Sequence, residues 1–283
     1  MRSFGRTILM GGLLTGALVL PFVASRPPAI AAKSYLGFDA NDYPGDEALS
    51  VLRQTFSFIS YWLGPPPGAK RNTWLGKRAL LQKKGFGLVI LFNGRESRGL
   101  KSEFYARQAG FHDADTAAKL ARAEGFPTRT VIFMDIEEGG RLSAAYHAYV
   151  KAWIDTLEMA DFRAGVYCSA IAVDEGGGVN ITSAKDLQEH LAGRRLVFWV
   201  YNDACPPSPG CAFPQTPPNP AKAGFPAAAI WQYAQSPRRR EFTARCPENY
   251  AADGNCYAPG DSARRWFLDA DVADSPDPSA PSK

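Results

Sequence analysis

The sequence contains eight short runs of apolar and β-branched residues, and helical patterns separate the earlier ones. The runs are residues 35–39, 56–62, 86–93, 130–137, 164–169, 196–203, 228–234 and 267–272. Helical periodicity predicts helices over residues 46–54, 74–84, 113–124, 143–159 and 183–191. Strands that alternate with helices form parallel βαβ units, and eight strands favour a closed barrel over an open sheet. We therefore predict an α/β fold, a TIM-like (β/α) barrel.

The last third of the chain departs from this alternation. Residues 204–226 and 235–265 are rich in Pro, Gly, Cys, Asn and Arg and have no sustained helical period. We expect the last helices of the barrel to be reduced or replaced by loops. Residues 275–283, which are rich in Ser and Pro, are predicted to form a disordered tail.

Residues 1–32 have the pattern of a secretory signal peptide. Arg2 and Arg6 precede an apolar run at residues 8–23, and small residues follow at 29–32. The run is short for a membrane span, although an uncleaved N-terminal anchor is the alternative. We expect residues 33–274 to form one monomeric domain that is secreted or lies in the periplasm or cell envelope, without a stable membrane span after cleavage.

Charge and cysteine content are consistent with export. The formal net charge is +4, and the signal segment holds three arginines and no acid, so the mature chain is near +1. This balance argues against a nucleic-acid partner. We pair the cysteines locally, as Cys205 with Cys211 and Cys246 with Cys256. Cys168 is left over in an apolar run, where a buried thiol is favoured over a nucleophile because no histidine is near it in sequence.

Acidic residues occupy the ends of several predicted strands, where a parallel barrel builds its active site. Asp135 and Glu137 end the fourth run and lie two apart, so they share one face of an extended strand. Burial and mutual repulsion separate the pKa values of such a pair and leave one carboxyl group protonated near neutrality, as acid-catalysed glycosidic cleavage requires. Asp39 and Asp269 join them as candidate catalytic residues. For Asp271 we favour a structural role.

Aromatic residues accompany the acids near the strand ends. Sugar rings stack their apolar C–H faces on aromatic rings, so we expect Tyr61, Tyr201, Trp231 and Tyr233 to bind substrate. The alternative is that about half of the aromatic residues near the strand ends fill the barrel.

Metal and nucleotide signals are weak. The three histidines, His112, His147 and His190, are scattered over predicted helices and loops, and no glycine-rich fingerprint precedes a helix. We expect no metal and no cofactor. Asp113 is interpreted as the N-cap of the helix over residues 113–124, and the alternative is that His112 and Asp113 face the barrel mouth.

The order of the motifs resembles that of the lysozyme-type muramidases of glycoside hydrolase family 25. The motifs GFD, DIE, GVYCS, FWVYND, WQYA and LDADV follow the order of that family and cover residues 35–272. The chain is more similar to a related bacterial secreted family of unknown function, called glycoside hydrolase-like. The segment DADTAAKLARAEGFP, before a strand that ends in acids, is especially similar to this second family.

The resemblance implies roles for the acids. Glu137 takes the position of the general acid, and Asp39, Asp135 and Asp269 take those of its partners. Muramidases cleave the β-1,4 bond after N-acetylmuramic acid with retention, and the proposed nucleophile is the acetamido group of the substrate, which the Asp beside the acid orients. The chain departs from the muramidases in its GFDAND motif and in two cysteine-bearing insertions around the seventh strand.

Two hypotheses follow from these observations. The first is an exported retaining glycosidase that acts on peptidoglycan or a related N-acetylated polysaccharide. The second is a catalytically inactive protein on the same barrel, which binds or scaffolds cell-wall carbohydrate. Several desolvated carboxylates favour chemistry over binding alone.

Overall fold

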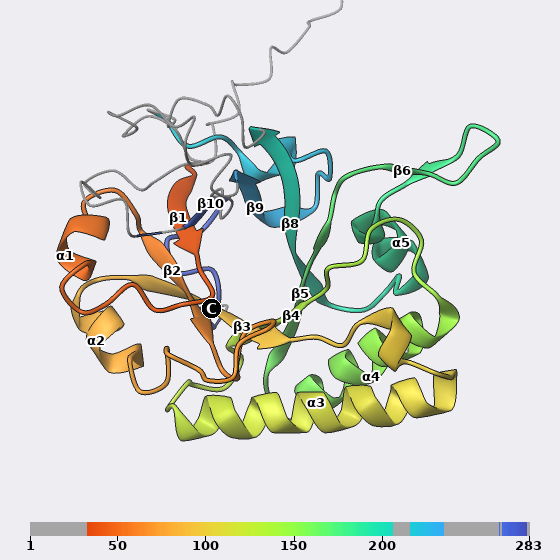
Figure 1. Cartoon of the computed structure of the whole chain (residues 1–283), viewed down its shortest axis with the longest axis horizontal. Helices are drawn as coiled ribbons and strands as arrows, with labels where there is room; N and C mark the ends of the chain where they lie inside the picture. Colours follow the sequence, from red (N-terminus) through yellow and green to blue (C-terminus); the bar gives the residue numbers. More distant parts are fainter. Residues whose placement is uncertain (1–32, 206–215, 235–265, 267, 282–283) are drawn as a thin grey trace, which may run out of the picture. The chain divides into compact units, whose positions relative to one another are not determined.

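A computed structural model describes residues 33–205, 216–234, 266 and 268–281, and its eight longest strands close into a barrel (Figure 1). The strand order around the barrel is β1-β10-β9-β8-β5-β4-β3-β2. The barrel strands are β1 (Tyr35–Asp39), β2 (Phe58–Trp62), β3 (Gly87–Asn93), β4 (Val131–Asp135), β5 (Arg163–Ser169), β8 (Leu196–Cys205), β9 (Ala228–Ala234) and β10 (Asp269–Ala273). The predicted α/β barrel is confirmed.

The helices of the barrel differ in length: helical structure is reduced late in the chain, as the sequence predicted, and the first two helices are short as well. They are α1 (Leu49–Leu52), α2 (Arg78–Lys83), α3 (Glu103–Ala123), α4 (Ala144–Met159) and α5 (Ser183–His190), with 3-10 turns η1 (Ser97–Gly99) and η2 (Pro220–Lys222). Between β8 and β9 the described residues hold only η2, and a short hairpin of β6 (Val173–Asp174) and β7 (Asn180–Ile181) precedes α5. Among the described residues, no helix has the length and apolar character needed to cross a membrane.

One strand runs against the others, which corrects the prediction of an all-parallel barrel. The strand β10 pairs antiparallel with both β1 and β9, whereas the other neighbouring barrel strands pair in parallel. Its first residue, Asp269, lies opposite Asp39, the last residue of β1. The start of β10 therefore reaches the end of the barrel where the parallel strands finish.

The helix α3 starts ten residues before the predicted helix. Ser102 is its N-cap and accepts a hydrogen bond from the backbone N–H of Tyr105. Asp113, the predicted cap, lies in the middle of the helix and binds other side chains. The helix packs along α4, and a side chain at Gly110 would come within 2.3 Å of the Tyr149 carbonyl oxygen, so the close approach of the two helices requires glycine there (Figure 1).

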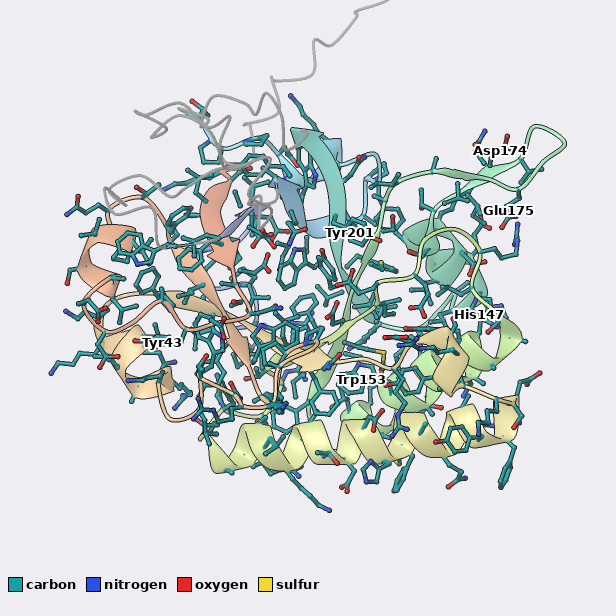
Figure 2. The ribbon with its side chains drawn as sticks, viewed as in Figure 1. Tyr43, His147, Trp153, Asp174, Glu175 and Tyr201 are labelled. Carbon is teal, nitrogen blue, oxygen red and sulfur yellow. The ribbon has the colours of Figure 1, made fainter. Side chains whose placement is uncertain are left out.

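The core fills both the barrel interior and the space between the sheet and the helices. Trp153 of α4 is fully buried, and its ring packs against that of Phe92 of β3 at 5.7 Å (Figure 2). Cys168 of β5 is fully buried with a free thiol, and burial raises its pKa, as expected for a structural cysteine.

The segment predicted to be disordered is ordered as far as Pro281 and covers the amino ends of β3 and β4. The Asp277 carboxylate accepts a hydrogen bond from the Leu88 N–H at 2.8 Å. Ser279 is buried, its Oγ accepts from the Ile90 N–H at 2.9 Å, and its carbonyl accepts from the Val131 N–H. Composition indicated disorder because the tail has few apolar side chains, but backbone groups of the barrel hold it in place.

We expect Ser279→Ala to lower the free energy of unfolding by about 1–3 kcal/mol, because it leaves the buried Ile90 N–H without its acceptor. The matched control is Ser50→Ala, at an exposed serine, which is expected to stay within about 0.5 kcal/mol of wild type. Urea unfolding followed by circular dichroism measures both variants. Equal stability of the two would show that the tail does not support the barrel.

Candidate active site

The first two acids of the candidate site come from β4 and the loop after it. Asp135 ends the strand with its carboxyl group buried, and its Oδ1 has no hydrogen-bond partner among the described residues. Burial raises the pKa of Asp135 well above its ordinary value, and the charges of Glu137, Asp39 and Glu138 raise it further. Glu137 still reaches solvent. Partial burial of its carboxyl group raises its pKa, and the charge of Glu138 raises it further.

The other two acids meet across the pair of strands that run in opposite directions. Asp39 and Asp269 are directly opposite each other in the β1–β10 register. Asp39 is buried, and its Oδ2 accepts a hydrogen bond from Nε2 of Gln232 on β9 at 2.7 Å. The reversed strand thus delivers an acid to the same end of the barrel as β1 and β4.

Tyr167 of β5 lies close enough to all four acids for their charges to act on its hydroxyl group. Burial raises the pKa of Tyr167, and the charges of Asp39, Glu137, Asp135 and Asp269 raise it further, in that order. The Tyr167 hydroxyl donates to Oε1 of Gln232 at 2.8 Å. A chain of hydrogen bonds therefore links β5 to β9 and β9 to β1 inside the ring of acids.

A cleft of about 780 Å³ opens beside the ring and includes Asp135, Glu137 and Glu138. The loop after β3 also lines this cleft. Arg95 of this loop forms a two-pronged ion pair with Asp113 at 2.6 and 2.8 Å. The Ser97 N–H donates to the Glu138 carboxylate, so the loop is fixed on both sides. These contacts therefore fix the loop that lines the cleft.

Of the four predicted aromatic residues, Tyr201 is the one in contact with the acid site. Its hydroxyl donates to the Glu137 carbonyl at 3.2 Å, and its ring lies 5.2 Å from that of Tyr167 (Figure 2). Tyr61 is buried on the outer side of β2, where its hydroxyl donates to Glu124 at the end of α3 and its ring packs on Trp74.

The two aromatic residues of β9 are placed differently from Gln232 between them. Gln232 points at Asp39 and Tyr167, so alternation along the strand turns Trp231 to the other face. Tyr233 lies at an irregularity of the β9–β10 register, between Gln232, which pairs with Asp271, and Ala234, which pairs with Ala270. Trp231 donates its indole N–H to the Asn202 carbonyl at 2.9 Å, and its ring packs edge-on against Tyr233 at 6.0 Å. Both side chains are buried.

Sequence reasoning did not select two residues that contact the acid site, Gln232 and Tyr167. Gln232 was detectable as the polar residue inside the apolar strand AAIWQYA, and Tyr167 as the residue that shares a strand face with Ser169. Attention to aromatic residues alone selected Trp231 and Tyr233 instead of the polar group between them.

The histidines are less scattered than the sequence indicated. His147 of α4 stacks on His190 of α5 at 3.8 Å, and its Nε2 lies 2.6 Å from an Asp186 oxygen (Figure 2). His112 contacts Asp113 on α3. Among the described residues, no group of three or more His, Cys, Asp and Glu side chains is arranged to hold a metal ion.

Some predictions fall outside the described residues. These are the signal peptide at residues 1–32 and the cysteines Cys211, Cys246 and Cys256; the structure also does not describe the side chain of Cys205. Both disulfides remain predictions.

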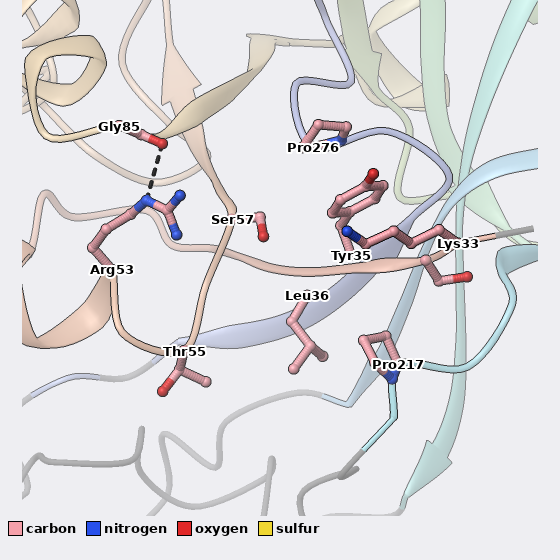
Figure 3. A pocket seen from close by; sticks show the side chains of 10 residues that line it. Lys33, Tyr35, Leu36, Arg53, Thr55, Ser57, Gly85, Pro217 and Pro276 are labelled. Carbon is pink, nitrogen blue, oxygen red and sulfur yellow. Dashed lines mark hydrogen bonds between the residues drawn. The ribbon is translucent and has the colours of Figure 1, made fainter.

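A second hollow, of about 430 Å³, lies at the opposite end of the barrel (Figure 3). It is lined by the starts of β1 and the segments before β2 and β3, and it contains the cations Lys33 and Arg53 but no acid. Arg53 donates to the Gly85 carbonyl at 2.9 Å. The acid-lined cleft is therefore the candidate active site.

An eight-stranded barrel with acids at the carboxyl ends of its strands is the arrangement expected of a glycoside hydrolase-like protein. The family model described as "Rv2525c-like, glycoside hydrolase-like domain" matches residues 69–237, more than half of the chain, and the protein belongs to this family. The resemblance found in the sequence is thereby confirmed.

Solved structures with similar folds have low sequence identity. An uncharacterized B. stearothermophilus protein has a TM-score of 0.53 at 18% identity, over 84% of this chain and 95% of that one. The spore cortex lytic enzyme SleM of Clostridium perfringens has 0.53 at 13%, over 89% and 70%. The Tat-secreted protein Rv2525c of Mycobacterium tuberculosis has 0.49 at 16%, over 85% and 95%. No curated protein matches the sequence.

Proposed function

We propose that this protein is an exported glycoside hydrolase that cleaves peptidoglycan or a related N-acetylated polysaccharide. The observation that carries the proposal is that the charges of four carboxyl groups, from β1, β4, the loop after β4 and β10, all act on the Tyr167 hydroxyl, beside an open cleft. Burial raises the pKa values of Asp135 and Glu137, and acids with raised pKa values that come together from distant parts of a chain are typical of catalytic sites.

Glu137 acts as the general acid in this proposal. It is the acid of the ring that lies at the cleft and reaches solvent, and its raised pKa favours a bound proton at higher pH than an ordinary glutamate. It protonates the oxygen of the leaving sugar as the glycosidic bond breaks. The hydrogen bond from Tyr201 to its backbone carbonyl holds the loop that carries it.

The aspartates stabilise the positive charge that develops on the sugar. Asp135 lies beside Glu137 and orients the substrate acetamido group, whose oxygen attacks the anomeric carbon and gives retention. Asp39 is fixed by Gln232, and Asp269 lies opposite it. The exposed edge of Tyr201 offers a ring on which a sugar can stack.

The proposal includes export of the protein to the cell wall. The family is named after Rv2525c, and the M. tuberculosis protein of that name is Tat-secreted. A signal peptide at residues 1–32, local disulfides Cys205–Cys211 and Cys246–Cys256, and a monomeric domain acting on the cell wall fit such a location.

The test is incubation of purified residues 33–283 with peptidoglycan sacculi and with N-acetylated glycan oligomers. We expect soluble muropeptides with new reducing ends, identified by mass spectrometry. If the protein binds sacculi without releasing reducing ends, the scaffolding hypothesis replaces the enzymatic one.

A further inference from the structure

Asp271 is the deepest acid of the barrel mouth and has no role in the mechanism above. It lies two residues after Asp269 on the same face of β10, and its exposed fraction is 0%. Across the strand pair it faces Gly37, which has no side chain, so Asp39 is its diagonal neighbour on β1. The phenyl ring of Phe58 occupies the position that a Gly37 side chain would take.

The two oxygens of Asp271 have different surroundings. Oδ1 accepts a hydrogen bond from the indole N–H of Trp199 on β8 at 3.0 Å. Oδ2 is buried and has no hydrogen-bond partner among the described residues. A buried polar atom without a hydrogen-bond partner is rare in folded proteins and requires an explanation.

The titratable groups that act on Asp271 include no cation among the described residues. They are Asp39 of β1, Asp269 of its own strand and Tyr233 of β9. Burial raises the pKa of Asp271 well above its ordinary value, followed by the charges of Asp39 and Asp269. An ionised carboxylate here would be a buried charge that faces two others of the same sign.

We propose that Asp271 is held as a neutral carboxylic acid whose Oδ2 hydroxyl donates a hydrogen bond to the Asp39 carboxylate. Two carboxyl groups side by side form such a bond only when one of them holds a proton, and the fully enclosed member is the one that retains it. Asp39 then accepts from Gln232 on one side and from Asp271 on the other. Asp271 is a positioning residue of the acid ring.

The hydrogen bond has a consequence for Asp39. A donor to the charged form of a carboxyl group lowers its pKa, so a hydrogen bond from Asp271 favours the ionised form of Asp39. An ionised Asp39 stabilises the cationic transition state, which is the step that rests on the proposed function. The protonation of Asp271 itself does not depend on catalysis.

The direct test is a titration of the aspartate side-chain carboxyl carbons by ¹³C NMR on the full mature domain. We expect a protonated aspartate signal at pH 7 that is present in wild type and in Asp135→Asn but absent in Asp271→Asn. If no such signal depends on residue 271, the proposal is wrong, whether or not the protein hydrolyses glycan.

The second test is the pH profile of kcat/KM. Asp271→Leu removes the donor, so the pKa of Asp39 rises and the acid limb moves to higher pH by about one unit. Asp271→Asn is neutral and retains an N–H donor, and we expect its acid limb near that of wild type. Identical acid limbs for wild type, the Leu variant and the Asn variant would overturn the positioning role.

Discussion

Glu137→Gln is expected to lower the rate of glycan hydrolysis by about 10²- to 10⁴-fold, the usual contribution of a general acid. Glutamine has nearly the same shape but no transferable proton. Because the Glu137 side chain reaches solvent and the hydrogen bond from Tyr201 goes to its backbone carbonyl, the substitution removes the proton and leaves the loop in place. Binding of intact glycan should change little.

The measurement is the release of reducing ends at several pH values, with binding to sacculi measured in parallel. A general acid must be protonated, so wild-type activity falls as pH rises through the pKa of Glu137. Burial and Glu138 raise that pKa, so activity extends further toward neutral pH than an ordinary glutamate would allow. The matched control is Glu175→Gln. Glu175 lies in the hairpin between β6 and β7 (Figure 2), and its carboxylate accepts a hydrogen bond from Arg141. Wild-type hydrolysis by the Glu137 variant would remove Glu137 as the acid.

The barrel was predictable because it is encoded in local patterns. Apolar runs of strand length separated by helical periods recur along the chain, and each of the eight runs contains or overlaps a barrel strand. The direction of β10 was not predictable in this way, because alternation of side chains is the same when a strand is read forward or backward. The reversal decides which acid reaches the mouth: Asp269 starts β10 there, and Asp271 lies deeper.

The candidate site was predictable where strand ends and residue chemistry coincide, as at Asp39 and Asp135. Residue type alone was misleading at β9, where the polar Gln232 faces the acids. Tyr61 lies on the outer side of its strand, where its hydroxyl donates to Glu124 at the C-cap of α3. Which face of a strand turns inward depends on pairing between distant segments, and the sequence does not state those pairings.

The tail and the start of α3 show the limit of composition as a guide. Residues 275–281 have few apolar side chains, yet Asp277 and Ser279 satisfy backbone N–H groups of β3 that the barrel leaves open. Asp113 has the chemistry of a helix cap, but its carboxylate is used by Arg95 and Tyr149. In both cases a tertiary partner changes the role that local sequence suggests.

Asp135→Asn is expected to lower hydrolysis by about 10²-fold, since a fixed charge beside the reacting sugar is lost, and to stabilise the fold at pH 7. The pKa of Asp135 is raised in the native state, so the native protein binds this proton more tightly than the unfolded chain does. Stability therefore falls as pH rises from the ordinary aspartate pKa through the raised one. Asparagine carries no charge at any pH and escapes this loss.

The expected gain at pH 7 is on the order of 1–2 kcal/mol, because an ionised carboxylate with one oxygen lacking a partner is replaced by a neutral amide. The gain should disappear near pH 4, where both states bind the proton. Thermal unfolding at the two pH values measures it, with Asp115→Asn as control, at a half-exposed position of α3 whose carboxylate pairs with Lys119. A residue that lowers stability but is needed for turnover is typical of a buried catalytic acid. If the variant is less stable than wild type at pH 7, the Asp135 charge is instead satisfied in the fold, and its assignment to catalysis loses this support.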